Sequence, residues 1–269
     1  EVLATGAVPA FPAGEPGSIV LDQGDVLELG AGPGLGPDAE RYPDLTGSLI
    51  EADQPIQVLA GHMCANVPAG WEACDHLEDT MPPIDVLGRR YIVAVPALPG
   101  AEAGRRFLLR IIATEDNTTL AFDPPQPGVA TSIAKRGDFV ELQQVDADLE
   151  ITGDQKLLVA QYMRGAVLSG GTADPSQGDP ALQVAVPVEQ YRRSYLFHAP
   201  VNYESNYVTI VAPSDATVNI DGTPVSSWQA LGVGVWHVAR VRLGDGPGGA
   251  ALNPKPRNFA DKEWQKSVA

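Results

Sequence analysis

The stretch Phe107-Leu-Leu-Arg-Ile-Ile-Ala-Thr-Glu-Asp-Asn-Thr-Thr-Leu-Ala-Phe122 decides the fold of this 269-residue chain. An aliphatic run ends at Ala113, a polar step centred on Asp116 follows, and β-branched residues resume at Thr118. Aspartate bonds its own backbone in turns, and β-branched side chains favour strands. The stretch therefore predicts a β-hairpin, in which two strands are joined by a tight turn.

Comparable short apolar segments occur along the rest of the chain, each bounded by Gly, Pro, Asp or Asn. They are 18–21, 24–29, 91–95, 156–163, 207–212 and 234–241. Apolar residues with helical spacing never persist through a capped window. The best helical candidate is the tail around Phe259, Trp264 and Val268. The sequence predicts an all-β protein of β-sandwich-like units.

Four sequence patterns occur twice and in the same order, which predicts an internal repeat of roughly a hundred residues. The pairs are 24–29 with 137–142, 53–58 with 154–159, 83–96 with 187–200, and 113–118 with 212–217. Their separations run from 99 positions (113 to 212) to 113 positions (24 to 137). We expect a β unit that is repeated in tandem.

The repeat predicts four segments. Residues 1–80 form a partial first unit plus a cysteine loop, 81–179 a complete unit, 180–246 a partial third unit, and 247–269 a tail. The two partial units lack complementary strands, and the chain begins with Glu1 instead of Met. Two explanations remain open: the chain is a piece of a larger protein, or a neighbouring molecule supplies strands by strand addition.

The composition excludes several classes of partner. Eighteen Lys and Arg against 34 Asp and Glu give a net charge of −16. Nucleic-acid backbones and anionic lipids both need a basic surface, so neither partner is expected. No apolar run reaches the roughly 18–20 residues that span a bilayer, which predicts no membrane insertion. The 28 Gly and 24 Pro fit turns between short strands.

The most distinctive local feature is the loop from Gly61 to Leu77, which contains both cysteines of the chain, Cys64 and Cys74. A disulfide that closes this loop is one interpretation, and it implies an oxidising compartment. Loops on β frameworks often mediate recognition, and a Gly/Ser-rich loop at 165–179 occupies the next unit junction. The candidate binding residues of the cysteine loop are His62, Asn66, Trp71, Asp75 and His76.

Two chemical alternatives for the same loop stay open. Four residues, His62, Cys64, Cys74 and His76, are of the types that bind zinc. The adjacent Asp75 and His76 could instead form an acid–base pair. Other catalytic signatures are missing: there is no Gly-x-Ser-x-Gly elbow, His-Glu-x-x-His motif, phosphate loop or dinucleotide fingerprint. We therefore predict no catalytic residue and no cofactor.

Two oxygen-rich steps, Asp146-Ala-Asp148 and Asn219 with Asp221-Gly222, contain residue types that bind calcium. Neither fits the calcium-binding loop of twelve residues, so ordinary turns are the better interpretation.

A family resemblance rests on four segments: 44–58, 61–68 with Cys64-Ala-Asn-Val-Pro68, 73–78 with Ala73-Cys-Asp-His-Leu-Glu78, and 81–91. Together they resemble the N-terminal domain family of IgG-Fc-binding proteins, as a bacterial secreted or surface member, over roughly 19–243. Cys64 and Cys74 match positions of the family pattern, whereas the sequence after Gly246 departs from it. The resemblance implies a secreted or cell-surface binding and adhesion module and not an enzyme.

Three functional hypotheses follow. The first is an extracellular, non-catalytic binding module for a protein or glycan. The second is a structural subunit that assembles with copies of itself by strand complementation, as a filament or surface layer. The third is a metal-dependent hydrolase at His62, Cys64, Cys74 and His76.

Overall fold

The computed structural model describes residues 9–12, 14–30, 44–69, 71–72, 74–97, 106–165, 167–168, 180–197, 199, 205–245 and 257–258. The chain divides into two compact units, Glu1–Ile50 and Glu51–Ala269. The tail helix expected near Trp264 and the loop 169–179 lie outside the described residues.

The first unit contains turns and extended backbone in its described part. Gly24 adopts a positive φ of 95°, and the Asp25 N–H donates to the carbonyl of Asp22 at 3.0 Å. Strands were expected at 18–21 and 24–29, but neither segment is a strand. Strand geometry needs a hydrogen-bonded neighbour, and no described residue pairs with these segments. The predicted strands there are wrong.

The described residues of the second unit form strands and two short 3₁₀ turns, so the all-β prediction is confirmed. The turns are η1 (Ile84–Val86) and η3 (Val188–Gln190). The strands are β1 (Leu59–Ala65), β2 (Trp71–Glu72), β3 (Asp75–Thr80), β4 (Gly88–Val93), β5 (Phe107–Ala113), β6 (Thr118–Asp123), β7 (Ser132–Ile133), β8 (Phe139–Val145), β9 (Leu149–Met163), β10 (Val167–Leu168), β11 (Ala181–Val184), β12 (Leu196–Phe197), β13 (Ser205–Pro213), β14 (Asn219–Ile220), β15 (Thr223–Pro224), β16 (Gln229–Leu231), β17 (Trp236–Asp245) and β18 (Arg257–Asn258).

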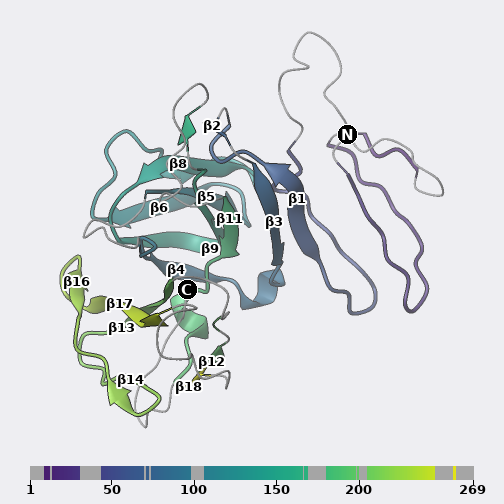
Figure 1. The fold of residues 1–269 in the computed structure, drawn as a ribbon. Helices are drawn as coiled ribbons and strands as arrows, with labels where there is room; N and C mark the ends of the chain where they lie inside the picture. Colours follow the sequence, from purple (N-terminus) through teal and green to yellow (C-terminus); the bar gives the residue numbers. More distant parts are fainter. Residues whose placement is uncertain are drawn as a thin grey trace. The chain divides into compact units, whose positions relative to one another are not determined.

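The 15-residue strand β9 holds the central sheet together (Figure 1). Its first part pairs with β4 and β6, and its second part pairs with β5 and β11. The change of partners falls between Gly153, which faces Leu120, and Leu157, which faces Ala113. Strand β9 therefore serves both layers of a curled sheet, and β7 and β8 extend it at its two ends.

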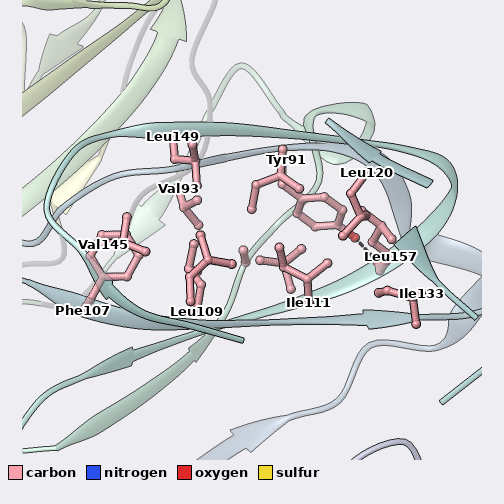
Figure 2. Close-up of a cluster of buried hydrophobic side chains, with 14 of the residues drawn as sticks. Tyr91, Val93, Phe107, Leu109, Ile111, Leu120, Ile133, Val145, Leu149 and Leu157 are labelled. Atoms are coloured by element: carbon pink, nitrogen blue, oxygen red, sulfur yellow. Dashed lines mark hydrogen bonds between the residues drawn. The ribbon is translucent and has the colours of Figure 1, made fainter. Parts of the chain in front are cut away.

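The buried core lies between these layers (Figure 2). Alternate residues of β5 point inward, and Phe107, Leu109 and Ile111 have no exposed surface. Tyr91 is equally buried. Its hydroxyl donates to the Leu157 carbonyl and accepts the Gly88 N–H at 3.2 Å. Burial raises the pKa of Tyr91 well above its ordinary value.

A three-stranded sheet, β13-β17-β16, packs against the outer face of β4. Ile92 and Ala94 share a core with Tyr191 and Trp236, whose rings meet edge to face at 5.8 Å. The other face of β13 contributes to a separate core that includes Val208, Ile210, Ala212, Val218, Ile220 and Leu243.

The two turns η1 and η3 show a local likeness between the predicted repeats. Each follows a proline, and in each case a tyrosine hydroxyl accepts the N–H of the residue three positions earlier. Tyr91 accepts from Gly88, and Tyr195 accepts from Arg192 at 2.9 Å. The repeat as a whole, and the segment boundaries drawn from it, stay predictions.

The oxygen-rich steps weighed as calcium ligands have other roles. Asp221 and Gly222 both adopt positive φ, 50° and 82°, in the two-residue turn between β14 and β15. Asp148 accepts the Val95 N–H at 2.8 Å and pairs with Arg240. The turn interpretation is confirmed at Asp221-Gly222, whereas Asp148 joins separate parts of the chain.

Candidate binding face at the cysteine loop

The cysteine loop grows out of a two-stranded hairpin. Strands β1 and β3 pair antiparallel from Leu59 opposite Thr80, with an irregularity between His62 and Ala65. The carbonyl of Leu77 occupies the position that a Cβ at residue 61 would need, so only glycine fits there.

Cys64 and Cys74 form a disulfide with their Cα atoms 5.0 Å apart. The bond joins the end of β1 to the residue before β3 and closes the loop. The disulfide interpretation of the sequence is confirmed.

A small apolar cluster fixes the loop to the central sheet. Val67 and Leu77 are each 5% exposed and pack with Leu108 on the outer face of β5, beside Tyr162 and Leu182. The Gly165 N–H donates to the carbonyl of Val67 at 2.8 Å. The loop therefore rests on buried contacts although much of its surface is exposed.

The two loops that the sequence nominated separately are joined by backbone pairing. Strand β2 in the cysteine loop pairs antiparallel with β10, which follows the central strand β9 and begins the second loop. Trp71 lies opposite Leu168, and Glu72 lies opposite Val167. A single surface thus includes the cysteine loop and the start of the second loop.

The polar candidates of the cysteine loop are mostly exposed. His62 is exposed, and its Nδ1 accepts the Cys64 N–H at 3.0 Å. Asn66 is also exposed. The His76 ring lies 3.1 Å from a Glu78 carboxylate oxygen, while Asp75 accepts the backbone N–H of His76 at 2.7 Å. We call the candidate residues His62, Asn66, Trp71, Asp75 and His76 the loop face.

The chemical alternatives for this loop gain no support. Zinc would need cysteine thiolates, but both sulfur atoms are bonded to each other. Across the described part of the chain, no three His, Cys, Asp or Glu side chains are grouped so as to hold a metal ion. The ring of His76 pairs with Glu78, whereas Asp75 accepts the backbone N–H of His76. The Asp75 carboxylate thus bonds the His76 backbone and not its ring, which gives no support to an Asp75–His76 acid–base pair.

Trp71 differs from the other candidates because it is half-buried against an arginine. The guanidinium carbon of Arg164 lies 4.0 Å from the centroid of the Trp71 ring, a cation–π contact. Arg164 is only 6% exposed, and its buried Nε has no hydrogen-bond partner in the part of the chain that the structure describes. Desolvation, and then the nearby Arg106, lower the pKa of Arg164.

Sequence reasoning missed Arg106 and Arg164. Each lies one residue outside a predicted strand, before Phe107 and after Met163. The only available clue was this flanking position. The strand register needed to bring the two together cannot be read from residue types.

These features define the class of protein: a disulfide-containing, all-β protein whose loops are supported by a β-sandwich with a buried core. The chain belongs to the family described as IgGFc binding protein, whose profile matches residues 1–259. The family resemblance found in the sequence is confirmed, and the family is one of binding proteins, whereas the bacterial origin and the secreted or surface location stay predictions.

A human relative, the IgGFc-binding protein of Homo sapiens, is 26% identical over 229 residues. The alignment covers 82% of this chain but only 4% of the human protein. No solved structure matches the chain. Among the described residues, no helix is long and apolar enough to cross a membrane.

Proposed function

We propose that the chain is a non-catalytic, extracellular binding module that contacts a protein partner through the loop face. The observation behind this proposal is the combination of exposed polar side chains with a disulfide and a buried support. Such a loop keeps its shape before binding, so association costs less conformational entropy. The family, described by the binding of IgG Fc, supports a protein as the partner.

An extracellular location is part of the proposal. A disulfide persists in secreted and surface proteins and is rare in reducing compartments. The Cys64–Cys74 bond joins residues ten positions apart in an exposed loop, where cytosolic reductants would reach it. The proposal therefore places the chain in an oxidising environment.

The first test uses the IgG Fc fragment as the probe, because the human relative is named for it. The immobilised chain is exposed to Fc, to Fab as the negative control, and to extracellular fluid from its source. A variant with alanine at His62, Asn66 and His76 is compared with the wild type. We expect the variant to bind the wild type's partner protein with an affinity that is lower by about tenfold or more.

A matched control carries alanine at Glu115, Thr131 and Lys135, which are exposed residues near the opposite end of β5. It should bind as the wild type does. Equal binding by the loop-face variant would overturn the proposed face, and no binding to any extracellular protein would overturn the function. Self-assembly by strand complementation is a separate prediction, and light scattering that shows a monomer at high concentration would contradict it.

A further inference from the structure

We propose that Arg164, Arg106 and Trp71 form an anion-receiving site at the edge of the loop face, which takes a carboxylate of an acidic side chain on the protein partner. This inference rests on the proposed function, because it names the chemistry that the loop face recognises.

The first argument is a like-charged pair across two strands. The β5–β9 ladder ends with Phe107 opposite Met163. One further step in the same register places Arg106 opposite Arg164, and the electrostatic effect of Arg106 on Arg164 agrees with this proximity. Like charges directly opposite each other destabilise a sheet. A bound anion would relieve this repulsion.

The second argument is the missing counter-charge. Other arginines of the second unit have carboxylate partners: Arg90 pairs with Glu150, Arg110 with Glu141 at 2.8 Å, and Arg240 with Asp148. Within the described residues, neither Arg106 nor Arg164 has such an ion pair. Among the residues that the structure describes, Arg106 donates to the Gln144 side chain, at 3.3 Å.

Burial makes the absence of a partner costly at Arg164. A buried charge is normally paired, and a buried N–H without an acceptor loses the hydrogen bond that it had with water. Arg164 is buried, and its Nε has no acceptor among the described residues. Although the protein is acidic overall, the buried guanidinium of Arg164 therefore lacks a described counter-charge. An anion from a binding partner would supply one.

The third argument concerns the kind of anion. The planar guanidinium offers parallel N–H donors that match the two oxygens of a carboxylate. Trp71 stacks on Arg164 at 4.0 Å and limits the orientations that this guanidinium can adopt. Trp and Arg are also the residue types that most often dominate protein–protein binding energy. These points favour an Asp or Glu side chain of a protein.

The experiment titrates the full chain with a blocked tetraglutamate peptide, its tetraglutamine analogue, and 3′-sialyllactose, all at low ionic strength. Binding is measured by calorimetry and by tryptophan fluorescence, with W71F identifying the contribution of Trp71. We expect the glutamate peptide to bind, the glutamine peptide not to bind, and salt to weaken the binding by screening.

Variants then locate the site. R106Q changes an exposed side chain and should fold normally, whereas R164K keeps the charge at the buried position and removes the planar fork. Each substitution should lower the affinity for the glutamate peptide by about tenfold, which is the loss expected for one charged hydrogen bond. R136Q removes an exposed arginine elsewhere on the sandwich and should leave binding unchanged.

Three results would overturn the inference. The wild type does not bind the glutamate peptide, R106Q and R164K bind it as tightly as the wild type does, or the wild type binds sialyllactose alone. Failure of this site is distinguishable from failure of the proposed function. Loss of a captured protein on substitution of His62, Asn66 and His76, together with no effect of R106Q, would leave the binding module standing and remove the carboxylate site.

Discussion

Tyr91 places a polar hydroxyl group within the central apolar core. Its hydroxyl donates to Leu157 and accepts from Gly88, so it joins β4 to the point where β9 changes partners. Tyr91→Phe should lower the free energy of unfolding by about 1–3 kcal/mol, because two buried groups lose a partner. Urea unfolding measures the change.

Tyr195→Phe is the matched control for this prediction. Its hydroxyl makes the equivalent bond to the Arg192 N–H, but the residue is only partly buried and that bond is exposed to solvent. It should cost less than Tyr91→Phe. Equal costs at the two positions would show that burial of the hydroxyl is unimportant.

The same tyrosine predicts a pH effect with a definite sign. Burial raises the pKa of Tyr91, so the folded state resists ionisation of this hydroxyl. The stabilising contribution is complete below the unfolded pKa of about 10 and falls as the pH rises above it. The wild type should therefore lose its advantage over Tyr91→Phe above pH of about 10, as measured by urea midpoints. A constant difference would contradict this.

Single residues also show what the sequence could and could not reveal about the site. Cys64 and Cys74 were recognisable because cysteine is rare in this chain and its bonding chemistry is narrow. Arg164 was not, because its role depends on Trp71 and Arg106, which are distant in the sequence. Only the β2–β10 and β5–β9 registers bring them together.

At the scale of elements, the disulfide should stabilise the β1–β3 hairpin above all. C64S/C74S should lower the unfolding free energy by about 2–3 kcal/mol, the chain-entropy value for a short loop. Hydrogen exchange should show the loss first at Val67 and Leu77, while Leu109 and Ile111 in the central core keep their protection. Uniform loss of protection would contradict a local role for the bond.

Two aspartates join neighbouring turns and strands of the sandwich. Asp116 accepts the Arg136 N–H at 2.9 Å, and Asp154 accepts the Thr119 N–H at 2.8 Å. These backbone hydrogen bonds are the main reason that the pKa of each carboxyl is lowered, with Lys135 assisting at Asp116. Their stabilisation is present above the unfolded pKa of about 3.9 and is lost as the pH falls through the folded values.

The double variant D116N/D154N tests this acid sensitivity, because asparagine keeps an accepting oxygen without the charge. The urea midpoint of the wild type should exceed that of the variant at pH of about 6, and the gap should close toward pH of about 2. A gap that stays constant would show that these carboxylates have no altered pKa in the folded state.

Sequence patterns predicted strands well where a ladder partner exists. The aliphatic run 107–113 coincides with β5, and 207–212 lies within β13. The hairpin predicted after residue 113 is wrong, because β5 and β6 each pair with β9 and not with each other. The expected strand 156–163 is only the second part of β9, which begins at Leu149. Gly153 and Asp154 are residue types that often end a strand. In the structure, β9 continues through them and crosses from one layer to the other. Such a change of partners is a tertiary property.

For the whole molecule, the second unit gains cohesion because β4 has a core on each face. Tyr91 and Val93 enter the central core, while Ile92 and Ala94 enter the core shared with β13 and β17. Arg240 on β17 adds a polar connection, since it donates to the Val95 carbonyl at 2.7 Å and pairs with Asp148. We therefore expect the sandwich and the β13-β17-β16 sheet to unfold together.

Trp236→Ala tests this coupling. Trp236 is 5% exposed in the shared core, contacts Tyr191 edge to face, and has the Arg90 guanidinium 5.3 Å from its ring centroid. Its removal should cost about 3–5 kcal/mol through the cavity that it leaves. Because the lost contacts link the two sheets, calorimetry should resolve two transitions where the wild type shows one.

Trp228→Ala is the matched control, since Trp228 packs against the separate core on the other face of β13 and away from β4. It should destabilise the β13-β17-β16 sheet without weakening the contacts to β4. If both tryptophan variants unfold in one transition with the same loss, the two sheets are coupled through contacts other than the shared core. If only Trp236→Ala separates the transitions, that core is what makes the second unit a single cooperative body.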